Sequence, residues 1–220
     1  MENFNDLLRF LTKLGENNNR EWFNDNKQEY ETTKEMFVEF LSYLISKIEA
    51  FDKDIVGVDP KKSMYRIYRD TRFSKDKTPY KTHFGGYICA GGRTSGNPGY
   101  YVHIEPNGNS IIGGGLYHPM PDILGKVRQE IDYNGDVLMK VINKDTFKRR
   151  FDIYQEDKLV RPPKGYDESN PYIDWLKLKS FLVMEDFSDK DVIGKTYTDK
   201  VVSGFKEMAP FIKFLREGMS

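Results

Sequence analysis

The chain has 220 residues, equal numbers of basic and acidic side chains (34 each) and a hydrophobic fraction of 38%. This length allows one large domain or two small ones with a real hydrophobic core. The lone Cys89 excludes an internal disulfide and favours a cytoplasmic protein. No 18 apolar residues run together and the N-terminus does not resemble a signal peptide, so we expect no membrane span.

The first 60 residues are predicted to be helical, because apolar residues recur every three or four positions. One helix should end near Leu14, since Gly15 follows it and the Asn run at 17–19 supplies N-cap candidates for the next. A broken and then a long amphipathic helix should follow and end near Phe51. Asp59-Pro60 closes this helical part.

The middle of the chain is predicted to form strands, because glycine becomes frequent and apolar residues alternate. Asn107-Gly108 is typical of a two-residue type I′ hairpin turn, which would pair His103 with Ile112. Tyr101, His103 and Glu105 would then share one face of the sheet, and a longer loop would change this register. The predicted strands span 64–69, 84–90, 100–105 and 110–117.

Helical periodicity returns after residue 119, and we expect helices over 123–131 and 137–142 and a long C-terminal helix over 197–215 with a kink at Pro210. A further strand is expected over 181–187. The favoured architecture is therefore a single α+β domain covering residues 1–220. Its central, mainly antiparallel sheet of about five strands should be flanked by N- and C-terminal helices.

The neutral total conceals a separation of charge along the chain. Residues 1–60 contain seven Lys or Arg and thirteen Asp or Glu, a net charge of −6, whereas residues 61–83 contain eight and two, a net charge of +6. The local excess at 61–83, called the basic segment below, needs an anionic partner. The sequence does not decide whether this segment faces a pocket or is neutralised by the acidic helices.

Arginines make the basic segment a candidate anion site, because a guanidinium can bind phosphate or carboxylate through two hydrogen bonds. We therefore expect a site for a phosphate- or carboxylate-bearing ligand here. The alternative is that Asp70 and Asp76 pair with the arginines and only brace the loop. The candidate ligand-binding residues are Arg66, Arg69, Arg72, Lys77, Lys81 and His83.

Four separated runs of sequence resemble a known family. They are NNNREWF, RDTRFSKDKTPYKTHFG, PGYYVHIEP with GGGLYHP, and RPPKGYD, in this order. Together they resemble an uncharacterised bacterial family known as a conserved domain of unknown function. The resemblance covers nearly the whole chain, so it implies one domain and a cytoplasmic setting. It implies no activity, cofactor or catalytic residue.

The histidines His83, His103 and His118 all fall in the predicted sheet region. They lack the HxH, HxxxH and HExxH spacings of metal sites, so we expect no metal ligands and ordinary hydrogen-bonded histidines. Proton transfer beside a bound anion is a further hypothesis, with His83 and Glu105 as candidates because His83 ends the basic segment. The sequence identifies no cofactor and does not decide whether the protein is an enzyme.

Three consecutive glycines, 113–115, are unusual in a strand, because glycine weakens a strand unless a bulge or a close neighbour requires it. A structural bulge is favoured, and a ligand or packed aromatic ring is the alternative. The run is neither a phosphate-binding loop nor a dinucleotide fingerprint, since GKS, GKT and a helix-opening GxGxxG are missing.

Two other functions compete with the anion site. Single-stranded nucleic acid could bind the basic segment, whose cations would contact phosphates while aromatic rings stack on bases. Overall neutrality and the lack of a recognised motif place this second. The third hypothesis is a structural or interaction role, in which the acidic and basic segments neutralise each other within one chain or between two chains. The sequence does not predict the oligomeric state. The aromatic residues that would stack on bases in the nucleic-acid hypothesis are Tyr65, Tyr68, Phe73, Tyr80, Phe84 and Tyr87.

Overall fold

The computed structural model describes residues 4–219, and it begins with the predicted helices. Helix α1 spans Asn5–Glu16, α2 Arg20–Asp25 and α3 Lys27–Ile48. Asn19 caps α2, because its side chain accepts a hydrogen bond from the Trp22 N–H at 2.9 Å. A 3-10 turn, η1 (Lys53–Ile55), and a short helix, α4 (Pro60–Ser63), complete the first part of the fold.

Within the described residues, five antiparallel strands form one sheet in the order β1-β2-β3-β5-β4. Helices precede and follow this sheet along the chain, so the predicted α+β class is confirmed. The strands are β1 Phe84–Cys89, β2 Gly99–Ile104, β3 Ser110–Leu116, β4 Asp152–Ile153 and β5 Phe181–Phe187.

The stretch expected as a strand at 64–69 forms no strand of the sheet, and its ladder contacts are two isolated bridges, Met64 with Gly86 and Tyr68 with Tyr80. Its first residues bond to β1, since the Tyr65 N–H donates to the Gly85 carbonyl at 2.9 Å. The rest bonds to the chain that returns from the loop, since the Lys81 N–H donates to the Ile67 carbonyl at 2.8 Å. The fifth strand is β4, which pairs with β5. The expected number of strands is confirmed, but the assignment of one strand to 64–69 is wrong.

The loop between β2 and β3, residues 105–109, is longer than the expected two-residue turn. The register therefore moves by one residue, and His103 lies opposite Ile111 rather than Ile112. Ile112 is fully buried on the face of the sheet that the helices cover. It packs so closely on Gly204 that a Cβ added at Gly204 would overlap the Ile112 side chain. Ile111 faces the other side of the sheet.

The remaining helices are α5 Pro121–Ile142, α6 Asp145–Arg150, α7 Ile173–Leu176, α8 Asp189–Val192 and α9 Tyr197–Glu217. The two helices expected over 123–142 form one element, whose backbone departs from helical angles at Asn134. Pro210 lies within α9. Among residues 4–219, none of the helices combines the length and the apolar character needed to cross a membrane.

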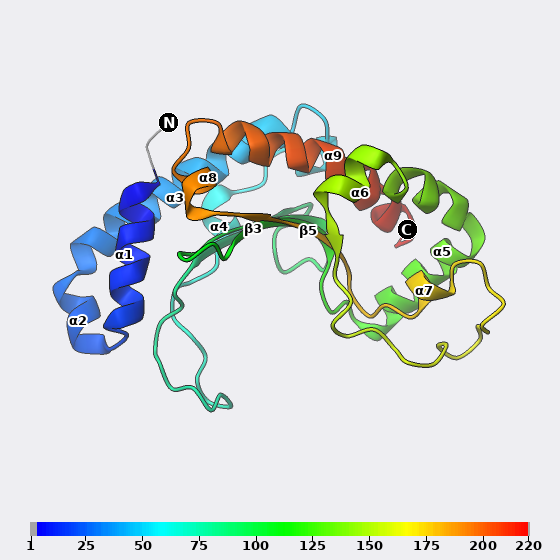
Figure 1. The fold of residues 1–220 in the computed structure, drawn as a ribbon, viewed down its shortest axis with the longest axis horizontal. Coiled ribbons are helices and arrows are strands. Elements are labelled where there is room, and N and C mark those ends of the chain that lie inside the picture. Colours follow the sequence, from blue (N-terminus) through cyan, green and yellow to red (C-terminus); the bar gives the residue numbers. More distant parts are fainter. Residues whose placement is uncertain (1–3, 220) are drawn as a thin grey trace.

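Helices α3 and α9 lie over one face of the sheet (Figure 1). The glycine run at 113–115 does not form the predicted bulge, since the register continues through it. The glycines instead allow α9 to pack closely on β3, because a Cβ added at Gly114 would lie only 3.0 Å from the side chains of both Ile212 and Met208. On the opposite side, called the open face below, the basic segment and the segment 155–172 project beyond the sheet (Figure 1).

Candidate ligand-binding cavity

A cavity of about 740 Å³ lies on the open face of the sheet. Side chains of β1, β2, β3 and β5 form its floor, and its walls come from the basic segment, residues 93–97 and the start of α5. Tyr87 connects the floor to the wall, because its hydroxyl oxygen lies 2.9 Å from the carbonyl oxygens of both Asn97 and Gly115. Cavities of about 300–1,000 Å³ are typical of small organic ligands.

Two cations at this cavity pack on the same aromatic ring. Lys81 Nζ lies 5.4 Å and Arg93 Cζ lies 5.2 Å from the centre of the Tyr65 ring. In the described part of the chain neither forms an ion pair with a carboxylate, and Arg93 Nε donates to the Lys62 carbonyl at 3.0 Å. Burial, and then the charges of Arg66 and Arg93, hold the pKa of Lys81 below its ordinary value. This part of the cavity is therefore electropositive.

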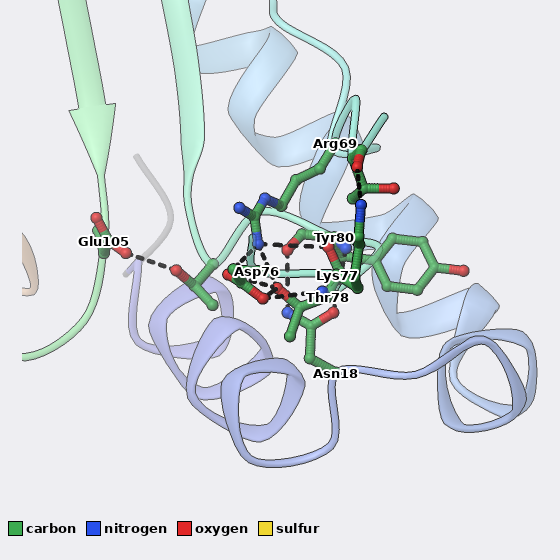
Figure 2. A network of polar contacts seen from close by, with 9 residues as sticks. Asn18, Arg69, Asp76, Lys77, Thr78, Tyr80 and Glu105 are labelled. Atoms are coloured by element: carbon green, nitrogen blue, oxygen red, sulfur yellow. Dashed lines mark hydrogen bonds and ion pairs between the residues drawn. The ribbon is translucent and has the colours of Figure 1, made fainter. Parts of the chain in front are cut away.

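Arg69, a predicted ligand-binding residue, braces the loop of the basic segment. Its guanidinium donates to Asp76 and to the Thr78 hydroxyl, and Figure 2 shows these side chains pointing toward one another. The Asn18 amide fixes the end of the loop, since it donates to the Tyr80 carbonyl at 3.0 Å and accepts from the Tyr80 N–H at 3.1 Å. Arg69 is therefore engaged inside the loop and does not line the cavity.

Arg72 and Lys77 have similar internal partners. Arg72 donates to both carboxylate oxygens of Asp70, at 2.9 and 2.6 Å. Lys77 donates to the Thr71 carbonyl at 2.9 Å. Arg66 is exposed and lies near enough to Lys81 to influence its pKa. The internal pairing with aspartates that the sequence offered as the alternative thus occurs at Arg69 and Arg72.

The acidic first 60 residues do not neutralise the basic segment through direct ion pairs. Within residues 4–219, Asp52 and Asp54 pair with Arg216 on α9, and the other ion pairs of the acidic segment lie within and between α1 and α3. The aspartates that bind the loop arginines belong to the basic segment itself. Among the described residues, the contacts between the two segments are therefore not ion pairs.

His83 lines the cavity beside Lys81 and belongs to a cluster of polar side chains. The Tyr101 hydroxyl lies 2.9 Å from His103 Nδ1, and His103 Nε2 lies 2.9 Å from Glu105 Oε2. The rings of His83 and His103 stack with centres 4.1 Å apart. These contacts confirm the shared face expected for Tyr101, His103 and Glu105.

The surroundings of this cluster set its charge. Burial, and then His103, lower the pKa of His83 to about 4, so this imidazole is neutral near pH 7. Burial alone would raise the pKa of Glu105, but hydrogen bonds with His103 and Thr82 outweigh it and hold that pKa below its ordinary value. The Thr82 hydroxyl donates to Glu105 at 2.6 Å, the dashed line at Glu105 in Figure 2. The cluster can therefore accept a proton or bind a cation.

The structure brings a second histidine and carboxylate together at another part of the cavity. His118 lines the cavity, and its Nδ1 lies 3.4 Å from Asp157 Oδ2, which also accepts from the Ser180 hydroxyl at 2.7 Å. His118 has a φ of 45°, a conformation that non-glycine residues rarely adopt. Sequence reasoning missed this pair, because Asp157 lies in a distant turn and no spacing pattern connects the two.

The fold and the cavity define the molecule as an α+β protein whose sheet carries helices on one face and a cavity of small-molecule size on the other. A family model for conserved hypothetical proteins, DUF2461, matches residues 6–214. The chain belongs to this family, which confirms the resemblance to a domain of unknown function. No curated protein and no solved structure shows significant similarity to the chain.

Proposed function

We propose that this protein binds a small organic anion, a phosphate or carboxylate with an apolar or aromatic body, in the cavity on the open face. The pair Lys81 and Arg93 carries this proposal, since both pack on Tyr65 at the cavity and neither forms an ion pair among the described residues. A partly buried charge is favoured by an opposite charge close by. The proposal keeps an anion site on the basic segment but centres it on Lys81 and Arg93.

The rest of the cavity indicates the body of the ligand. Tyrosine rings together with Leu182 and Met184 line it, and its volume of about 740 Å³ is far larger than one phosphate group requires. The anionic group would therefore bind at the two cations while the body covers the floor. In the enzymatic form of the proposal, His83 transfers a proton to or from the ligand, and Glu105 stabilises the charged imidazole.

Phenyl phosphate is a suitable probe, and it should bind more tightly than phenol, which has the same ring without the charge. Lys81→Met removes the ammonium group and keeps most of the apolar stem. We expect it to weaken binding of phenyl phosphate about tenfold or more, because a hydrogen bond to a charged group contributes about 1.5–3 kcal/mol. Isothermal titration calorimetry at low salt measures these affinities.

Lys75→Met is the matched control, since Lys75 belongs to the same basic segment but is exposed and does not line the cavity. It should leave the affinity nearly unchanged. Equal affinities for phenol and phenyl phosphate would argue against an anion site. An equal loss in the Lys75 and Lys81 variants would show that only the general charge of the segment matters.

Single-stranded nucleic acid is the second candidate, favoured by one observation at the tip of the loop. Phe73 is 96% exposed, and the Arg72 guanidinium carbon lies 5.8 Å from its ring centre, which suits stacking on a base. Tyr80 and Phe84 are buried and Tyr87 lines the cavity, so fewer rings are available than the sequence indicates. Fluorescence anisotropy should show oligonucleotide affinity that falls steeply with salt and with Phe73→Ala; affinity insensitive to both excludes this function.

The cytoplasmic setting remains a prediction. It rests on the single cysteine and on the family resemblance, and Cys89 is a buried free thiol in the structure. A buried thiol of this kind is compatible with a reducing compartment. Localisation of a tagged chain in intact cells would test the prediction directly.

A further inference from the structure

We propose that His83, His103 and Glu105 form a binding site for a divalent transition metal ion at the edge of the cavity. One potential ligand atom from each lies within 4.8 Å of the other two, and among residues 4–219 these are the only three such side chains so placed. The pairing of β1 with β2 brings these side chains together, because it sets Gly85, two residues after His83, opposite His103. Spacing along the chain does not reveal this convergence.

The distances need little adjustment to hold an ion. Zn²⁺ binds histidine nitrogen at about 2.0–2.1 Å and carboxylate oxygen at about 2.0–2.2 Å, so two ligand atoms of one ion lie about 3 to 3.5 Å apart. Glu105 Oε2 lies 2.9 Å from His103 Nε2 and 4.0 Å from His83 Nδ1. The first distance is close to this range, and the second requires a shift of roughly 1 Å or less. The two imidazole nitrogens lie within 4.8 Å of each other, so they require a shift of less than about 2 Å.

Neighbouring groups orient the ligand atoms. The Tyr101 hydroxyl lies 2.9 Å from His103 Nδ1, which leaves Nε2 directed at Glu105. Thr82 donates to Glu105 Oε1 at 2.6 Å, which leaves Oε2 for the two imidazoles. Contacts of this kind fix the ligands of metal sites. Two nitrogens and one carboxylate suit Zn²⁺ and similar transition metals better than Mg²⁺ or Ca²⁺.

An ion at this site would change the chemistry of the cavity. Three protein ligands leave a position for water or for an anion. His83 lines the cavity, so the ion would add positive charge beside Lys81. The lone pairs of His83 and Glu105 that bind a metal ion cannot accept a proton at the same time, so a bound ion would exclude the proton transfer described above. The metal site goes beyond the anion proposal, and metal ions alone test it, so either proposal can fail without the other.

The test is a titration of chelator-treated protein with Co²⁺, whose visible absorption reports its coordination, followed by competition with Zn²⁺. We expect one equivalent of Co²⁺ to bind, Zn²⁺ to displace it, and excess Mg²⁺ to leave it in place. Loss of an orienting contact typically weakens metal binding 10–100-fold, so Thr82→Val should weaken it about tenfold. His103→Gln and Glu105→Gln, which remove a ligand, should each weaken it at least about a hundredfold.

His118→Gln is the matched control, because His118 also lines the cavity and lies beside a carboxylate, Asp157. It should leave metal binding unchanged, and circular dichroism will show whether each variant is folded. If the glutamine variants do not fold, the unsubstituted protein and Thr82→Val still decide the question. The proposal is overturned if the unsubstituted protein binds no stoichiometric ion. It is equally overturned if His118→Gln weakens binding as much as the ligand variants do, or if Thr82→Val has no effect.

Discussion

Replacing Gly115 with alanine is expected to destabilise the fold by more than about 3 kcal/mol. Gly115 lies in β3 opposite Leu182 and has a φ of 127°, which a residue with a side chain rarely adopts. An added Cβ would also overlap the Phe181 carbonyl oxygen and lie 3.1 Å from the Phe211 ring. The carbonyl belongs to the neighbouring strand, so it cannot rotate away as a side chain could.

Urea denaturation followed by circular dichroism measures this loss of stability, and Gly125→Ala is the control. Gly125 lies in α5 with no atom near the position of an added Cβ. Alanine there should be neutral or stabilise the fold by up to about 1 kcal/mol, since alanine favours helix more than glycine does. A Gly115→Ala protein that unfolds at the same urea concentration as the original chain would contradict the close approach of β3 and β5.

Replacing Asp52 with asparagine is expected to lower the free energy of unfolding by about 3 kcal/mol, since it removes the more buried of the two carboxylates that pair with Arg216 and leaves that largely buried charge with the exposed Asp54 alone. The two Asp52 oxygens accept from Arg216 at 3.0 Å each, and the Tyr100 hydroxyl donates to one of them at 2.9 Å. The side chains of Asp52 and Arg216 are only 9% and 17% exposed. This pair joins the start of η1 to α9. The exposed pair Asp136 and Lys140 is the control, and Asp136→Asn should cost no more than about 1 kcal/mol.

The effect of Asp52→Asn should depend on pH. Burial alone would raise the pKa of Asp52, but hydrogen bonds from Arg216 and Tyr100 outweigh it and hold the pKa below its ordinary value. A carboxyl with a lowered pKa in the folded state stabilises the fold above its unfolded pKa of about 3.9 and loses this contribution as pH falls. The difference in unfolding free energy between the original chain and the variant should thus be constant above about pH 5 and shrink below about pH 4. A difference that does not change with pH would contradict the ion pair.

The sequence predicted most of the fold because long periodic elements carry their own signal. The strand expected at 181–187 and the helix expected at 197–215 correspond to β5 and α9. The stretch 64–69 alternates like a strand, but only its first residues bond to β1, through Met64 and Tyr65, and the rest bonds to the chain that returns from the loop. Strand β4 has only two residues, Asp152 and Ile153, too few to show alternation.

The candidate site was predicted less completely, because its residues come together only through pairing across the sheet. Alternation along β2 was enough to place Tyr101, His103 and Glu105 on one face. The approach of His83 depends on the register of β1 against β2, which no local pattern reveals. Arg93 lies in a glycine-rich loop outside the basic segment, so a search for charge runs did not include it.

A crystal structure of the protein with phenyl phosphate tests the central claim of an anion site most directly. We predict phosphate oxygens within hydrogen-bonding distance of Lys81 Nζ and of the Arg93 guanidinium, with the phenyl ring over the cavity floor. Phosphate bound at Arg69 or Arg72 instead, or a cavity without ligand at a saturating concentration of phenyl phosphate, would contradict this account.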